Sequence, residues 1–348
     1  MYSGSEELLR NAWVTLGQPR TVKEVKETSA MVSTNQVYQL TLEDGHQVFA
    51  KVSSYGSYVH FRQDHTLINE WIRLLRRTRY RSLLARVLTK DDKVFTYREG
   101  NSWAVFYEKV PFYDFLPPRL TEAQVIALGK EMARLHQASA KAAKELPPTW
   151  KSVGSDIASL FDFLGSKAWR DERGLSDALE GVLRDQCEQF LSNAAALGYQ
   201  TMQRIPVLID WNIGNFSVGF DGRGFKLFSR WDYDWFRIEP RTLDFYFCAR
   251  VVRDEGDQDV FSYLTSPLTE PRFLMFLRAY HQIYPLDAND VLMLKEAYRF
   301  FILNYVVRSG EHFFRPSICR RLLTEAIETY LPSLERLDLK PLADKLLG

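Results

Sequence analysis

The sequence predicts an α+β protein built from two lobes, a small β-rich N-terminal lobe and a larger, mostly helical C-terminal lobe. Its 348 residues exceed what one hydrophobic core usually serves, which favours two folding units. Strand patterns dominate up to residue 110, whereas amphipathic helical patterns dominate after the proline-containing stretch at residues 111–118. We therefore expect an N-lobe of residues 1–110 and a C-lobe of residues 111–348.

The N-lobe is expected to contain five strands and one helix. The strand segments alternate in polarity, and Gly45 in the turn EDGH suits a hairpin between the second and third strands. Leu67, Trp71 and Leu74 recur at helical spacing, which predicts an amphipathic helix over residues 65–78. The strand segments are residues 21–30, 36–45, 47–54, 86–100 and 102–110.

The C-lobe is expected to open with a helix. Thr121 and Gln124 have the spacing of a capping box, and the apolar periodicity continues through residue 140. Helical patterns also dominate the remainder, except at residues 206–232, where short apolar segments surround the turn DGRG at residues 221–224. These segments predict a small β structure where the lobes join.

Composition narrows the class of protein. Lys and Arg total 45 and Asp and Glu total 44, so the net charge of +1 gives no basic excess for nucleic acid or an anionic membrane. Cys187, Cys248 and Cys319 are far apart and lack C-x-x-C spacing, which argues against a zinc site or disulfide framework. No signal-peptide pattern or long apolar run is visible. We expect a cytoplasmic protein with neither nucleic acid nor membrane as partner.

Lys51 interrupts the apolar strand VFAKVS, and Glu70 lies on the helix that follows. Each has an ordinary explanation, because a lysine on a half-exposed strand and an acid on a helix surface both point to water. Together they match the strand lysine and helix glutamate with which kinases hold the α- and β-phosphates. The pair predicts a phosphate-binding Lys51 braced by the Glu70 carboxylate.

The stretch VLIDWNIGNF at residues 207–216 places Asp210 at the end of an apolar run and Asn215 five residues later. An aspartate at a strand end can orient and deprotonate a hydroxyl, and an asparagine oxygen can bind Mg²⁺. Asp232 follows the next strand, where a carboxylate can hold Mg²⁺ at the β- and γ-phosphates. An Asx-type turn explains Asp210 and Asn215 equally simply, so the spacing alone does not decide.

As a set, these residues resemble the aminoglycoside phosphotransferase and choline kinase family, small-molecule kinases with a protein-kinase-like fold. The resemblance spans about residues 21–331. It implies use of ATP or GTP with Mg²⁺, a small hydroxylated substrate, Asp210 as catalytic base, and Asn215 and Asp232 as metal ligands. It also implies that the backbone near Glu108 and Val110 meets the adenine.

Two other positions match the family's motifs. ALGKEMARLHQAS at residues 127–139 resembles its LG…LH helix and includes His136, although a histidine on an apolar helix face is usually a packed core residue. Asp244 in PRTLDFY corresponds to the structural aspartate of the family, whereas its ordinary explanation is a helix N-cap.

The chain departs from the family in the residues before Asp210. Leu208 and Ile209 stand where the family usually has His-Gly, and the loop ETSAMVSTNQ at residues 27–36 lacks the glycines of protein kinases. The departure does not remove the proton acceptor or the metal ligands that the resemblance implies, but it loosens the hydrogen bonding expected around the loop. The loss of the histidine leaves a second hypothesis open, a pseudokinase that acts as a nucleotide-sensing or protein-binding module.

Overall fold

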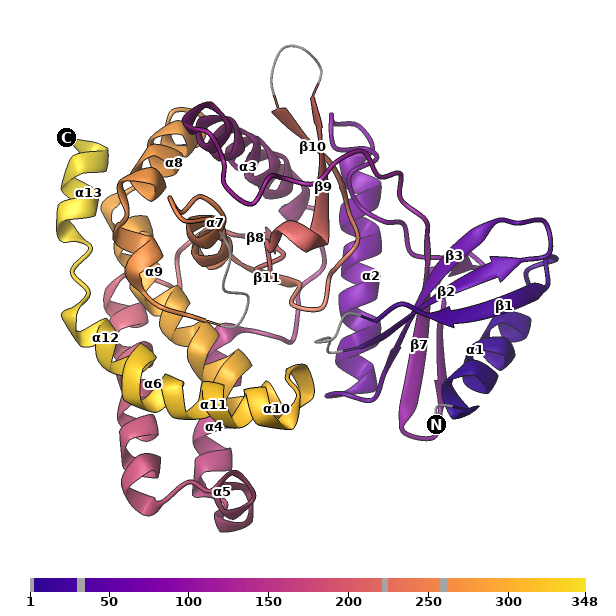
Figure 1. The fold of residues 1–348 in the computed structure, drawn as a ribbon, viewed down its shortest axis with the longest axis horizontal. Helices are drawn as coiled ribbons and strands as arrows, with labels where there is room; N and C mark the ends of the chain where they lie inside the picture. Colours follow the sequence, from indigo (N-terminus) through magenta and orange to yellow (C-terminus); the bar gives the residue numbers. More distant parts are fainter. Residues whose placement is uncertain (1–2, 30–34, 221–224, 257–261) are drawn as a thin grey trace.

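The computed structural model describes residues 3–29, 35–220, 225–256 and 262–348, and it has the two-lobed α+β architecture that the sequence predicts (Figure 1). The N-lobe contains a five-stranded antiparallel sheet in the order β1-β2-β3-β7-β6. Gly45 has a φ of +80° in the turn between β2 and β3. The strands are β1 (Val22–Glu27), β2 (Gln36–Leu42), β3 (Gln47–Ser53), β6 (Thr96–Glu99) and β7 (Ser102–Glu108), with a separate ribbon of β4 (Thr89–Lys90) and β5 (Lys93–Val94).

Helices cover both faces of this sheet, and one of them was not expected from the sequence. Helix α1 (Ser3–Leu16) packs its apolar side on one face, where the Trp13 ring meets Phe106 edge-on at 5.3 Å. Lys51 and its cross-strand neighbour Val105 belong to the opposite face. The lysine therefore points away from α1 and toward the C-lobe.

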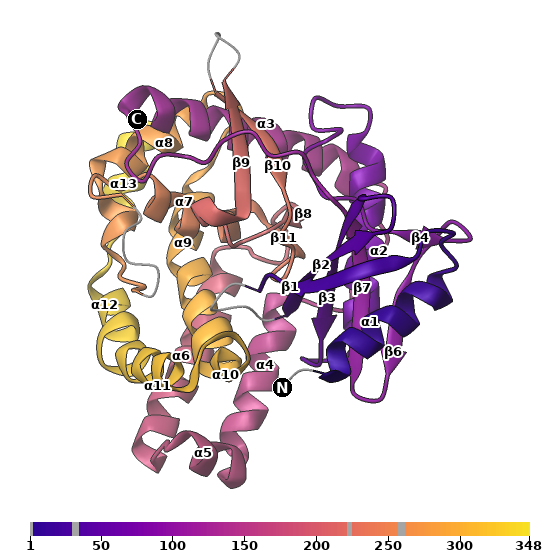
Figure 2. The ribbon, with the colours of Figure 1, turned by 45° about the vertical axis from the view of Figure 1, so that its right-hand side comes forward.

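Helix α2 (Tyr58–Leu75) packs against the C-lobe as well as the sheet (Figures 1 and 2). It begins before the expected residue 65 because Ser57 caps it, its side chain accepting the Val59 N–H. Trp71 is buried 6.0 Å from the Phe236 ring of the C-lobe. The apolar side of α2 therefore belongs to the C-lobe core, while the 110/111 lobe boundary stays a prediction.

Helices make up most of the C-lobe, and the first begins as expected. In α3 (Glu122–Ala143) the predicted capping box is formed by Thr121 and Gln124. A Cβ at Gly129 would lie 2.5 Å from the Phe276 carbonyl oxygen, so α3 can approach α8 only with glycine there. The other helices are α4 (Val153–Gly165), α5 (Lys167–Arg173), α6 (Asp177–Ala196), α7 (Phe245–Val251), α8 (Pro271–His281), α9 (Ala288–Phe301), α10 (Gly310–Phe313), α11 (Pro316–Glu325), α12 (Leu331–Arg336) and α13 (Lys340–Leu347), with π-helical turns at Ile302–Arg308 and Ala326–Tyr330.

Two strand pairs lie where the lobes join. The first pairs β8 (Arg204–Val207) with β11 (Arg237–Pro240), a strand that the sequence did not predict. The second pairs β9 (Phe216–Phe220) with β10 (Phe225–Arg230), and the DGRG turn between them lies outside the described residues. The register places Arg237 opposite Val207 and Arg230 opposite Phe216. Residues 208–215 and 231–236 therefore leave the strands side by side.

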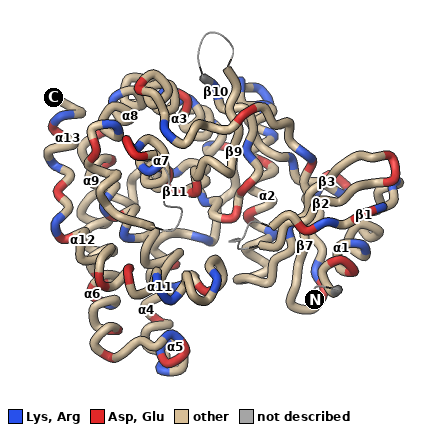
Figure 3. The backbone as a smooth tube through the Cα atoms, in the orientation of Figure 1, with Lys and Arg blue, Asp and Glu red and all other residues tan. Residues whose placement is uncertain are grey.

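The charged residues are mixed over the whole fold, and the lengths of the helices bear on whether any of them could cross a membrane. Lys and Arg are interspersed with Asp and Glu along both lobes (Figure 3). Among the described helices, none is long and apolar enough to cross a membrane. The expected cytoplasmic location and the absence of nucleic acid as a partner remain predictions.

Candidate active site

Lys51 joins the two lobes through an ion triad. Its Nζ lies 2.7 Å from Asp232 Oδ1 and 2.5 Å from Asp234 Oδ1, and the lysine is only 6% exposed. Burial disfavours the lysine charge, but the two carboxylates outweigh it and raise the pKa of Lys51. Burial acts against the Asp232 charge as well, yet Lys51 holds the pKa of Asp232 down at about 2. Burial and repulsion from Asp232 raise the pKa of Asp234.

The expected pairing of Lys51 with Glu70 is wrong in this structure. The Glu70 carboxylate binds Arg73 Nε at 2.8 Å on the surface of α2, with 35% of its side chain exposed. The helix turns His65 toward the sheet instead, and Glu70, five residues on, lies about 140° around the helix axis. His65 Nε2 is 2.5 Å from Tyr107 Oη, and burial lowers the pKa of this histidine to about 4, so it is neutral. Asp234, and not Glu70, is the second carboxylate that pairs with Lys51.

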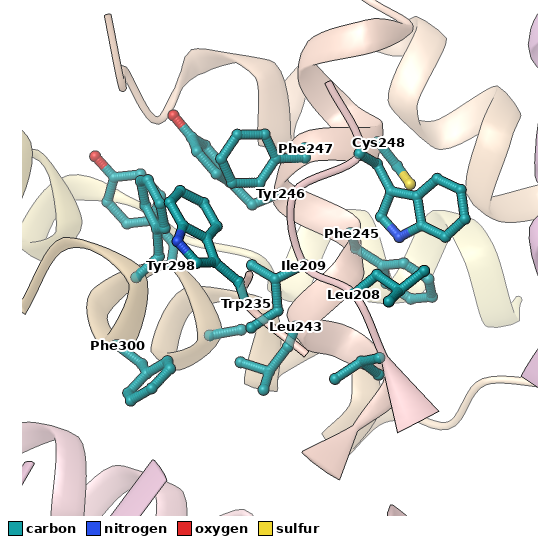
Figure 4. Close-up of a cluster of buried hydrophobic side chains, with 14 of the residues drawn as sticks. Leu208, Ile209, Trp235, Leu243, Phe245, Tyr246, Phe247, Cys248, Tyr298 and Phe300 are labelled. Carbon is teal, nitrogen blue, oxygen red and sulfur yellow. The ribbon is translucent and has the colours of Figure 1, made fainter. Parts of the chain in front are cut away.

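The loop from Leu208 to Asn215 has a strained backbone before Asp210. Ile209 has a φ of +61°, a region that β-branched residues rarely adopt. The Asp210 N–H donates to the Leu208 carbonyl at 2.7 Å, which closes a three-residue γ-turn centred on Ile209. The Ile209 side chain is nevertheless 2% exposed, and it lies with Leu208 among the aromatic residues of the C-lobe (Figure 4). Leu208 and Ile209 thus contribute core contacts, and Ile209 does so at the cost of backbone strain.

The Asp244 carboxylate stabilises this strained turn by accepting two of its main-chain N–H groups. Its Oδ1 accepts the main-chain N–H groups of Leu208 at 3.0 Å and of Ile209 at 2.6 Å. Its Oδ2 lies 2.9 Å from His136 Nε2, and His136 Nδ1 lies 2.8 Å from Tyr280 Oη. Asp244 makes no side-chain N-cap, so its ordinary explanation fails. His136 is indeed buried in the core, where it orients Asp244.

Asp210 is half-buried at the end of the turn, and its carboxylate faces Asn212. Its Oδ1 accepts the Asn212 side-chain Nδ2 at 2.5 Å and the Asn212 N–H at 3.3 Å. Burial and the nearby Asp232 charge raise the pKa of Asp210 to about 6, while Arg230 and Arg250 oppose the rise. A carboxylate with this proton affinity can accept a hydroxyl proton near neutral pH.

The structure brings Asn215 next to Asp232. The Trp231 N–H donates to the Asn215 carbonyl at 3.4 Å, across the open end of the β9–β10 hairpin. Asn215 Nδ2 donates to the Asp210 carbonyl at 3.3 Å, and Asn215 Oδ1 accepts no hydrogen bond within the described part of the chain. An ionised carboxylate and an amide oxygen are ligands that suit Mg²⁺. The described residues hold no group of three His, Cys, Asp or Glu side chains that could bind a metal alone, so phosphate and water oxygens would complete the shell.

Glu108 and Val110, the residues expected to meet the adenine, differ in whether their main-chain groups are available to a nucleobase. The Glu108 N–H donates to the Arg86 carbonyl at 2.8 Å, and its carboxylate pairs with the Arg86 side chain. The peptide groups of Val110 have no hydrogen-bond partner within the described residues. The aromatic residues Phe112 and Trp231 lie beside this segment, with ring centroids 6.4 Å apart. Of the two, Val110 keeps its donor available for a nucleobase.

Sequence reasoning assigned no site role to two residues, Asp234 and Arg230, that lie beside the predicted ones. Asp234 was visible as the second acid of W-D-Y-D, but only the fold shows that it binds Lys51. Arg230 is a cation inside the strand KLFSR, and it is 1% exposed, with Nη2 donating to the Asp210 carbonyl at 2.8 Å. A charged residue in an otherwise apolar strand was the signal that could have found it. Residues 30–34 of the loop at residues 27–36, which was considered for phosphate binding, lie outside the described residues.

Comparison with solved structures identifies the fold. A microcompartment-associated aminopropanol kinase superimposes with a TM-score of 0.57 at 17% identity, covering 89% of this chain and 93% of the other. The amicoumacin kinase hAmiN gives 0.59 at 14% identity, with 98% of both chains covered. The choline kinase LicA from Streptococcus pneumoniae gives 0.58 at 14%, covering 96% of this chain and 100% of the other. No protein-family model matches the chain, and no curated protein does. The chain has the protein-kinase-like fold of small-molecule kinases.

Proposed function

We propose that this protein is a nucleotide-dependent phosphotransferase that moves the γ-phosphoryl group of ATP or GTP to a hydroxyl of a small molecule. The observation that carries the proposal is the convergence of Lys51, Asp210, Asn215 and Asp232 between the lobes. Four residues separated by up to 181 positions meet there. A phosphoryl-transfer site needs these groups: a cation for phosphate, a base, and two oxygen ligands for a metal.

The nucleotide would lie between the lobes. Lys51, held by Asp232 and Asp234, would offer its ammonium to the phosphate oxygens. The Val110 N–H is available to a nucleobase on the hinge side. The amicoumacin kinase structure contains AMP-PNP and Ca²⁺, which supports a nucleotide and a divalent cation in this fold.

Asp210 would act on the acceptor. Its carboxylate orients the hydroxyl and takes its proton as the new O–P bond forms, while the bond from the γ-phosphorus to the bridging oxygen breaks and ADP or GDP leaves. Asn215 and Asp232 would hold Mg²⁺, which supplies charge neutralisation for the phosphate oxygens when bound. Because such catalysis consists mostly of positioning and charge stabilisation, these few groups suffice.

The decisive experiment is acceptor-dependent release of ADP or GDP. The purified chain is incubated with MgATP or MgGTP and a panel of hydroxylated metabolites, beginning with amino alcohols because neighbours in the fold are kinases of aminopropanol and choline. Asp210→Ala should abolish turnover and leave nucleotide binding largely intact, whereas Asp171→Ala, on an exposed helix, should behave as wild type. Normal turnover by the Asp210 variant would refute the assignment of the base.

A second candidate, a pseudokinase that senses nucleotide or binds protein, is favoured by the residues before Asp210. Leu208 and Ile209 replace the usual His-Gly pair, and Glu70 does not brace Lys51. Thermal unfolding with and without MgATP separates the candidates, because a ligand that binds only the folded state raises the melting temperature. A shift without acceptor-dependent ADP release favours the sensor, and no shift with any nucleotide rejects both nucleotide-based functions.

A further inference from the structure

Arg230 is a fully buried cation that forms no ion pair with any described residue. It lies on β10, two positions before Asp232, and it is 1% exposed. Its Nε and Nη1 atoms are buried without a hydrogen-bond partner. Buried arginines are normally paired with a carboxylate, because taking a charge out of water is costly. Folding stability therefore gives no reason for an arginine at this position.

Within the described residues, Arg230 makes one side-chain hydrogen bond, and it reaches the loop that contains Asp210. Nη2 donates to the Asp210 carbonyl at 2.8 Å, and the guanidinium lies 4.7 Å from the centre of the Trp211 ring. Asn215 Nδ2 donates to the same carbonyl at 3.3 Å. A single oxygen atom thus ties together Arg230, the peptide of the proposed base and the side chain of a proposed metal ligand.

Arg230 is itself held in place by the chain that enters from the N-lobe. Its N–H donates to the Leu83 carbonyl at 2.7 Å, and its own carbonyl accepts the Ala85 N–H at 3.0 Å. The Tyr233 hydroxyl donates to the same Arg230 carbonyl at 3.3 Å. The backbone of Arg230 is therefore fixed, and its guanidinium extends from it to the loop that contains Ile209 and Asp210.

We propose that Arg230 is a positioning residue that fixes the Asp210 peptide, and with it the relation between Asp210 and Asn215. This role rests on the proposed function in so far as Asp210 is the base, but the placement of the loop can be tested without any activity. Burial lowers the pKa of Arg230 while the surrounding aspartates counteract it, which agrees with a cation retained for its contacts in this site.

The test compares Arg230→Met with Arg230→Lys. Methionine fills similar space without charge or donors, so R230M should fold with a melting temperature equal to or above that of wild type. Hydrogen exchange of residues 208–216 should accelerate about tenfold or more, and kcat should fall about 100-fold with the nucleotide KM nearly unchanged. R230K, which keeps a donor and a charge, should recover part of both losses.

Arg272→Met is the matched control, because Arg272 also donates to main-chain carbonyls, those of Val252 and Leu120, outside this site. It should leave exchange in residues 208–216 unchanged. Unchanged exchange and kcat in R230M, or losses that R230K does not recover, would overturn the proposal. If R230M does not fold, exchange in R230K decides, and it must exceed that of wild type. If wild type transfers no phosphate, the proposed function fails while the exchange comparison still tests Arg230.

Discussion

The Asp244 carboxylate accepts the main-chain N–H of Ile209 at 2.6 Å, and Ile209 has a φ of +61°. An acid 35 positions later in the chain therefore holds the strained residue that precedes Asp210. Strained backbone persists only where its surroundings impose it, and such strain gathers at functional sites. The shape of the loop from Leu208 to Asn215 is thus imposed by the C-lobe core and not by local preference.

Removing the Asp244 carboxylate should unfold this arrangement. In Asp244→Ala the buried N–H groups of Leu208 and Ile209 lose their acceptor, so we expect a loss of about 2–4 kcal/mol in the free energy of unfolding. Urea denaturation measures this loss. Asp254→Ala, at a surface ion pair with Arg119, should change stability by less than about 1 kcal/mol. Equal effects of the two substitutions would mean that the hydrogen bonds of Asp244 to Leu208 and Ile209 contribute nothing to stability.

The strain at Ile209 predicts an unusual response to glycine. Ile209→Gly loses a buried side chain but relieves a positive φ, whereas Ile205→Gly on β8 loses a similarly buried side chain without that relief. The cost of Ile209→Gly should therefore be smaller by about 1–2 kcal/mol. Denaturation of the two variants side by side checks this. A larger cost at residue 209 would show that the turn is not strained.

The bracing of Lys51 can be assigned by comparing two acids. Because Arg73 on the helix surface is the only partner of Glu70 among the described residues, Glu70→Ala should change the phosphotransfer rate by less than about twofold. Asp234→Ala removes a 2.5 Å contact to the buried lysine and should lower the rate about 100-fold. Steady-state kinetics with saturating nucleotide measures both. A large loss in Glu70→Ala would show that the lysine changes partner during turnover.

The proton affinity of Asp210 predicts an acid limb in the pH profile. As the proposed base, Asp210 must be ionised to accept a proton, and its pKa is raised to about 6 by burial and by Asp232. We expect kcat/KM to fall about tenfold per pH unit below that value. The profile is measured from pH 5 to 8 for wild type and for Asp171→Asn as control. A limb that stays near pH 4 would contradict the burial of this carboxyl group.

The same shift predicts a stability difference with a definite sign. The folded-state pKa of Asp210 lies above its ordinary value, so its contribution to stability is full below about pH 4 and is lost as the pH rises through 6. Asp210→Asn should therefore be more stable than wild type by about 1–2 kcal/mol at pH 7, with the gain disappearing at pH 4. Denaturation at the two pH values tests this. A variant less stable than wild type at pH 7 would reverse the expected sign.

The sequence predicted correctly those features of the structure that local interactions determine. The five-stranded sheet, the capping box at Thr121 and the loop from Asp210 to Asn215 depend on alternation, cap chemistry and chain order. The fold class and the resemblance to small-molecule kinases are confirmed by the structural neighbours. The roles of Lys51 and Asp232 remain predictions, although the structure brings the two together.

The misjudged features depend on contacts that no local pattern contains. Which face of α2 meets the sheet is set by packing, and that packing turns His65 inward and leaves Glu70 on the surface. Asp234 finds Lys51 across 183 positions. Helix α1 was not predicted because its apolar residues are interspersed with polar ones in a short segment. Their role becomes clear only when the sheet face that they cover is known.

The two faces of the N-lobe sheet bury their side chains in separate cores, one with α1 and one with α2 and the C-lobe. The core on the α1 side can therefore loosen in a local opening while the loop from Leu208 to Asn215 keeps its native shape. Lys51 belongs to a strand of that sheet yet binds Asp232 and Asp234 of the other lobe. A ligand bound at this point would add to the link between the sheet and the C-lobe, so we expect the α1 side of the sheet and the C-lobe to unfold more nearly together when it is bound.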